Sequence, residues 1–156
     1  MPFVLSSPDF GHGGEIPPRF TCDGPDISPA LVWSGLPEGT ASLALIVDDP
    51  DAPDPAAPKM VWVHWVLYNI PPDAPGLGRD LRALPPGTGE GLNDWGETGW
   101  RGPCPPIGRH RYFFRLHALD ARLPDIGTPT KSELLAAARG HILATAELMG
   151  TYERQR

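Results

Sequence analysis

Prolines and glycines divide this chain into short segments. The 156 residues include 21 prolines and 18 glycines, a quarter of the total, with no internal repeat. Proline fixes φ and lacks a backbone N–H, so it interrupts helices and central strands. Disordered chains share this composition, but five tryptophans and several apolar runs favour a folded protein rich in loops. We expect one domain, residues 1–156, with a single core.

Four of the segments predict β-strands, because they are short, apolar and rich in β-branched and aromatic side chains. They are residues 29–34, 42–49, 60–70 and 110–119. Short strands joined by proline- and glycine-containing loops favour an antiparallel sandwich or barrel over alternating strands and helices. Residues 71–100 are expected to be mostly loop, which is either functional, a surface excursion or an oligomer contact.

One long helix is predicted near the end of the chain, within residues 130–154. Thr130 followed by Glu133 is a capping-box pattern, and Gly150 is a stop signal. His141 is interpreted as a packing or surface histidine beside the apolar stripe. The residues expected to face the core have helical spacing: Leu135, Ala138, Ile142, Ala146 and Met149.

Charge and cysteine content narrow the function classes. The net charge is −6, and only residues 101–122, with five arginines and Asp120, are basic. This balance argues against duplex nucleic acid as a partner; the arginines lie on solvated faces or attract a small anion. With no signal peptide and no apolar run of about 18 residues, we expect a cytoplasmic protein without stable membrane insertion. Cys22 and Cys104 are able to pair, but a reducing cytosol favours free thiols.

Common catalytic motifs are missing from the sequence. It has no G-x-S-x-G elbow, P-loop, G-x-G-x-x-G, H-E-x-x-H or paired C-x-x-C. Residues 48–55, "DDPDAPDP", instead place four carboxylates after a strand. Asp-Pro pairs make turns, and a cis bond at Ala52–Pro53 fits such a loop.

His64 interrupts the apolar strand predicted at residues 60–70. Alternation puts Trp62, His64 and Val66 on one face; Val63, Trp65 and Leu67 are expected on the other face. A buried histidine needs partners for its ring nitrogens. A carboxylate from residues 48–55 is a natural partner, and it would favour the imidazolium. His64 is therefore either a satisfied core histidine or part of a site.

Four side chains together would form a small-anion site: Asp49, His64, His110 and Tyr112. Two imidazoles and a phenol can donate hydrogen bonds, while Asp49 would orient a histidine and raise its pKa. The proline-stiffened stretch 102–109 delivers His110 and Tyr112 to a strand. Backbone at Gly102–Cys104 would add a close wall, since glycine permits near approach.

Three motifs resemble the phosphatidylethanolamine-binding protein family, also called the Raf kinase inhibitor-like family. They are "DPDAP" (49–53), "WVHW" (62–65) and "GPCPPIGRHRYFF" (102–114), in that order. The stretches "TCDG" (21–24), "SPALVW" (28–33) and "AELMGTY" (146–152) resemble its bacterial and archaeal branch. The resemblance spans roughly residues 3–153.

The resemblance implies a mainly β fold, an antiparallel β-sandwich with Greek-key connections, long loops and a C-terminal α-helix. It implies a cleft for phosphate-like or carboxylate-like anions, including phospholipid head groups in some members. Cys104 stands where animal members carry a second proline, and Tyr152 is only a candidate neighbour of the cleft. The ligand-binding residues carried over are Asp49, His64, Gly102, Pro103, His110 and Tyr112, with Cys104 beside them.

The leading hypothesis is a non-enzymatic module that binds a small anion, without metal, cofactor or catalytic residues. By the resemblance it modulates a protein partner such as a kinase and forms a homodimer. One alternative is a metal-dependent enzyme, because Asp49, His64 and His110 have the ligand types of a facial triad. Another is a thiol hydrolase in which His110 activates Cys104.

Overall fold

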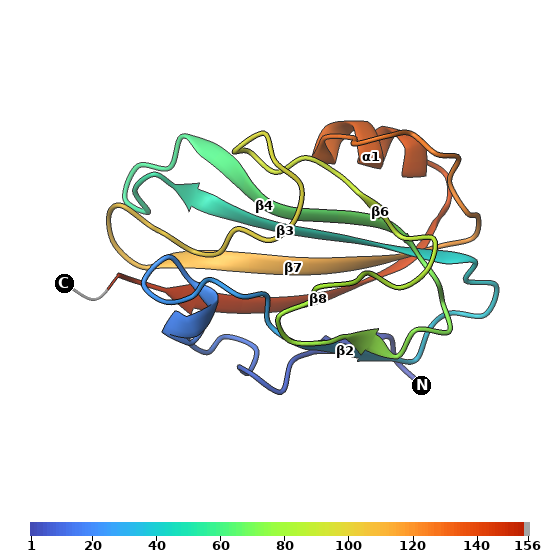
Figure 1. The fold of residues 1–156 in the computed structure, drawn as a ribbon, viewed down its shortest axis with the longest axis horizontal. Helices are drawn as coiled ribbons and strands as arrows, with labels where there is room; N and C mark the ends of the chain where they lie inside the picture. Colours follow the sequence, from blue (N-terminus) through green and yellow to red (C-terminus); the bar gives the residue numbers. More distant parts are fainter. Residues whose placement is uncertain (155–156) are drawn as a thin grey trace.

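Two antiparallel β-sheets face each other in the computed structural model, which describes residues 1–154 (Figure 1). The five-stranded sheet has the order β6-β4-β3-β7-β8, and the three-stranded sheet has the order β1-β2-β5. The fold class is therefore confirmed as a mainly β, antiparallel sandwich with long loops. The larger sheet contains β3 (Ser42–Ala52), β4 (Met60–Ile70), β6 (Gly89–Glu90), β7 (His110–Leu119) and β8 (Ile142–Tyr152). The smaller sheet contains β1 (Val4–Ser6), β2 (Leu31–Ser34) and β5 (Gly76–Leu77).

The larger sheet is covered on both faces. Leu45 of β3 and Phe114 of β7 pack with Trp33 of β2 in the core between the sheets. Ile46 faces the other way and packs with Leu134 of α1 (Lys131–Ala138). A strand with apolar neighbours on both faces reads as a continuous apolar run, which explains the unbroken "LALIV" of β3.

The long C-terminal helix is a wrong prediction, since α1 ends at Ala138. The expected capping box is present: Thr130 accepts a hydrogen bond from the Glu133 amide, and the Glu133 side chain accepts one from the Thr130 amide. Gly140 then adopts a φ of +81°, a left-handed conformation that glycine tolerates. The following residues form β8, which pairs with β7 along its whole length.

No helix among residues 1–154 is long and apolar enough to cross a membrane.

The free edge of β8 is covered by the start of the chain. Glu15 pairs in parallel with Thr151, and the Ile16 amide donates to the Thr151 carbonyl at 2.8 Å. Ile16 itself is buried in the core between the sheets. Exposed strand edges invite pairing with other chains, so this segment protects the sheet.

A β-bulge in β4 determines where His64 points. Val47 pairs with Trp65, but the next residue of β3, Asp48, pairs with Val63. His64 is therefore the extra residue, and a bulge of this kind turns the side chains around it. The simple alternation expected for β4 is wrong as a result: Trp65 lies in the core between the sheets, whereas Val63 packs beneath α1.

Candidate functional site

A cavity of about 240 Å³ lies where β3, β4 and β7 meet the loops around them. It brings together five of the candidate residues: Asp49, His64, Cys104, His110 and Tyr112. Gly102 and Pro103 are buried nearby but do not line it. The remaining lining is mostly apolar or aromatic: Ala52, Pro53, Met60, Trp62, Trp95, Pro105 and Pro106. The expected cis bond between Ala52 and Pro53 is present.

Asp49 and His110 form a buried pair on the wall of the cavity. His110 Nδ1 donates to Asp49 Oδ2 at 2.6 Å, and His110 Nε2 faces the Ile107 carbonyl at 2.8 Å. Both ring nitrogens thus face oxygen acceptors. The other Asp49 oxygen accepts from the Asp51 amide at 2.7 Å. Burial raises the pKa of Asp49, although the His110 and Asp51 hydrogen bonds oppose this. The carboxylate therefore orients the His110 ring.

His64 is buried and has no carboxylate partner, so the carboxylate expected for it is wrong. Its Nδ1 donates instead to the Arg101 carbonyl at 2.5 Å. Burial lowers the pKa of His64 to about 4, and His110 adds to the effect. The ring is therefore neutral at pH 7, with its proton on Nδ1. Within residues 1–154, Nε2 has no hydrogen-bond partner. It can therefore accept a hydrogen bond from a ligand in the cavity.

Tyr112 lies between the two histidines. Its ring meets that of His64 edge-on, with centroids 5.3 Å apart, and stacks with that of His110 at 6.4 Å. Burial raises the pKa of the Tyr112 phenol, and the nearby Asp49 and Asp51 carboxylates act in the same direction. The phenol stays protonated, and a hydrogen bond towards Asp49 contributes to the raised pKa.

Comparison with known proteins identifies the family to which this sequence and fold belong. Residues 6–153 match the model of the phosphatidylethanolamine-binding protein family. The chain belongs to this family. A UPF0098 protein from Methanothermobacter thermautotrophicus is 51% identical over 153 residues, covering 96% of this chain and 98% of that protein. A UPF0098 protein from Chlamydia muridarum is 46% identical over 152 residues, covering 96% and 98%.

Solved structures of the phosphatidylethanolamine-binding protein family share the fold along the whole chain. A Chlamydia trachomatis homologue of the family superposes with a TM-score of 0.91 at 44% identity, covering 98% of each chain. Escherichia coli YbcL, described as a new member of the mammalian family, gives a TM-score of 0.87 at 33% identity, covering 98% of this chain and 99% of YbcL. The family predicted from the motifs is confirmed, and this chain is a ligand-binding protein of that fold.

Gly102 of the family's G-P pair is required by packing rather than by a ligand. Its amide donates to Asp26 Oδ1 at 2.9 Å. A β-carbon added at this position would lie 2.0 Å from the Phe20 carbonyl oxygen and 2.3 Å from Asp26 Oδ1. Glycine therefore lets residues 20–26 press against the back of the cavity wall.

We expect Gly102→Ala to lower the free energy of unfolding by about 1–3 kcal/mol, the usual cost of an overpacked site. The added methyl group must push the Phe20 backbone away and break the Asp26 bond. Urea denaturation of the oxidised protein measures the change. Gly78→Ala is the matched control, because a β-carbon there meets nothing within 4 Å; equal losses for the two variants would contradict the packing argument.

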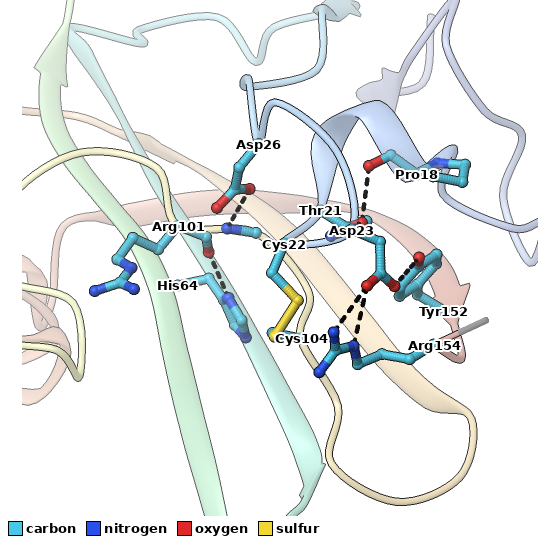
Figure 2. The surroundings of a disulfide bond; sticks show 11 residues. Pro18, Thr21, Cys22, Asp23, Asp26, His64, Arg101, Cys104, Tyr152 and Arg154 are labelled. Carbon is cyan, nitrogen blue, oxygen red and sulfur yellow. Dashed lines mark hydrogen bonds and ion pairs between the residues drawn. A yellow bond between two sulfur atoms is a disulfide. The ribbon is translucent and has the colours of Figure 1, made fainter. Parts of the chain in front are cut away.

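The expectation of free thiols is wrong, because Cys22 and Cys104 form a disulfide (Figure 2). The bond joins residues 82 apart in sequence. Cys104 consequently has no thiolate with which to attack a substrate, so the thiol-hydrolase alternative loses its nucleophile. The sequence favoured free thiols only through an assumed reducing compartment, whereas the fold places the two loops in contact.

The metal-enzyme alternative finds no support in the geometry. Among residues 1–154, no three histidine, cysteine, aspartate or glutamate side chains are arranged to hold a metal ion. His110 uses both ring nitrogens for Asp49 and Ile107. His64 directs Nδ1 to Arg101, so the three side chains do not share a centre.

Sequence reasoning missed the aromatic wall of the cavity. Trp62 and Trp95 meet edge-on with centroids 5.4 Å apart, and Trp95 also contacts the His64 ring at 5.1 Å. The Arg101 guanidinium lies over Trp95, 4.6 Å from the ring centre. Trp62 was assigned to the His64 face, but Trp95 lies in the long loop, where no periodicity indicates its direction.

Proposed function

We propose that the cavity binds a small molecule carrying a phosphate monoester or a carboxylic acid. The observation that carries this proposal is the neutral His64, whose unpartnered Nε2 accompanies the protonated Tyr112 phenol on the cavity wall. His64 Nε2 can accept a hydrogen bond from the ligand, and the Tyr112 hydroxyl can donate one when it turns from Asp49 towards the ligand. A singly protonated phosphate offers both an O–H donor and oxygen acceptors, so it complements the pair.

The charge of the wall supports the singly protonated form. The Asp49 carboxylate is hydrogen-bonded to His110 at 2.6 Å, and Asp51 is paired with Arg111 at 2.9 Å. The mostly apolar lining adds no cation. A dianion would lose its hydration without a matching charge, which is costly. The form that keeps one proton and uses it to donate a hydrogen bond to His64 avoids part of this cost.

We expect O-phosphoethanolamine to bind more tightly at pH 6 than at pH 8, by roughly 50-fold if only the singly protonated phosphate, with a pKa near 6, is bound. The dependence comes from the ligand proton, because His64 stays neutral across this range. Isothermal titration calorimetry at the two pH values measures it, and binding at pH 8 is accompanied by proton uptake.

His64→Ala is expected to weaken binding at pH 6 and to flatten the pH dependence. His141→Ala is the control, since this histidine is half-exposed and bonded to Asp120 on the surface. Parent-like binding by His64→Ala, or equal affinity at pH 6 and pH 8 in the parent, would rule the proposal out.

A further inference from the structure

The disulfide lies at the edge of the cavity and is open to solvent. Cys22 follows the short 3₁₀ helix Pro18–Phe20, and Cys104 precedes β7. Both cysteines are exposed, and Cys104 is also part of the cavity lining, next to Pro105 and Pro106. Exposed disulfides are more accessible to attacking thiols than buried ones, and they are more often regulatory.

The Cys22 end of the bond is fixed to the body of the protein. The neighbouring Asp23 accepts from the Tyr152 hydroxyl at 2.5 Å and from Arg154 Nε at 3.1 Å (Figure 2). Thr21, on the other side, is buried and donates from Oγ1 to the Pro18 carbonyl at 2.8 Å. Tyr152 is buried at the end of β8, so the sheet itself holds this end.

The Cys104 end belongs to the segment that orients His64. Arg101, three residues before Cys104, supplies the carbonyl that keeps the His64 proton on Nδ1. The Gly102 amide is bonded to Asp26 at 2.9 Å, and the Pro103 carbonyl accepts from the Cys22 amide at 3.1 Å. None of these bonds involves the sulfur atoms, so opening the disulfide does not by itself remove them.

We propose that the Cys22–Cys104 disulfide is a redox switch for ligand binding in the cavity. This inference rests on the proposed function. A dithiol reductant opens the bond: the sulfur–sulfur bond breaks, two thiols form, and the dithiol becomes a disulfide. Residues 101–106 are then held to residues 20–26 by hydrogen bonds alone. Preorganisation of a binding site contributes to affinity, so the reduced protein binds the ligand more weakly.

The test measures O-phosphoethanolamine binding at pH 6 to the oxidised protein, the reduced protein and the reoxidised protein. We expect reduction to weaken binding by at least about fivefold, the lower end of ordinary coupling between sites, and reoxidation to restore it. The double variant Cys22→Ser/Cys104→Ser binds like the reduced protein and does not respond to the reductant. Equal affinity of the oxidised and reduced proteins overturns the switch.

Hydrogen exchange of the Arg101, Gly102 and Cys104 amides in the two redox states separates this proposal from the proposed function. Faster exchange in the reduced protein, confined to residues 101–104 and 20–26, is the expected result. If neither state binds the ligand, the proposed function fails, and the exchange rates then decide the redox inference. Unchanged exchange in that case overturns it.

Discussion

Replacing His64 with asparagine is expected to remove most of the loss of stability that the protein suffers between pH 6.5 and pH 4. The pKa of His64 falls from its usual 6.5 to about 4 in the fold. Below pH 6.5, His64 becomes protonated in the unfolded chain but stays neutral in the folded protein. The stability contributed by neutral His64 is therefore complete above pH 6.5 and is lost as the pH falls towards 4, by about 3 kcal/mol from linkage.

Asparagine is chosen because its amide can still donate towards the Arg101 carbonyl. Urea denaturation at half-unit steps of pH gives the two stability curves. Burial also lowers the pKa of His117, helped by Arg115 and Lys131, so the parent curve contains a second contribution of the same sign. The difference between parent and variant isolates His64. His141→Asn, a surface substitution, should keep the steep decline; a His64→Asn curve that falls as steeply as the parent would refute the assignment.

Asp49→Ala is expected to destabilise the protein by about 1–3 kcal/mol, which is typical when a buried hydrogen-bond donor is left without its acceptor. The substitution takes away the acceptor for His110 Nδ1 and for the Asp51 amide. His110 is buried and would face an apolar void in place of a carboxylate. Urea denaturation at pH 7 measures the loss.

Asp54→Ala, in the same acidic stretch of residues 48–55 but beyond the end of β3, is the matched control. The Asp54 side chain accepts from the Ala56 amide in an exposed turn, and surface substitutions usually change stability by about 0.5 kcal/mol or less. The two variants remove the same charge from the same segment. If they lost equal stability, the Asp49–His110 pair would not be the source of the effect.

The strands were predictable because local composition and tertiary packing agree there. Residues 60–70 and 110–119 were predicted from β-branched and aromatic runs, and β4 and β7 have these bounds. The short strands β1, β5 and β6 (two or three residues each) were not predicted, because so few residues show no alternation. Their pairing depends on the neighbouring strand rather than on their own sequence.

The C-terminal segment shows two competing periodicities. Ala138, Ile142, Ala146 and Met149 fit a helix, but Ala146, Leu148, Gly150 and Tyr152 fit a strand, and these four are the buried residues of β8. Pairing with β7 decides between them, because tertiary context overrides propensity. The positive φ of Gly140 separates the two elements.

The candidate site was only partly predictable, because its hydrogen bonds also depend on tertiary contacts. The resemblance placed Asp49, His64, His110 and Tyr112 at one cavity, where they do lie. The hydrogen-bond partners of these side chains were not all predicted correctly. Asp49 bonds to His110, and His64 bonds to the Arg101 backbone carbonyl. A bulge at His64 and the contact between residues 20–26 and 102–104 determine these bonds, and both depend on the register of strands distant in sequence.

The cover over the edge of β8 has a consequence for biosynthesis. Residues 13–16 lie against β8, a strand that is translated more than 120 residues after them. Until residue 152 has been translated, Ile16 has no completed strand to pack against, and the sequence separation of this contact makes its closure late. Ile16, which is buried in the folded protein, therefore stays without this packing partner while residues 17–151 are translated.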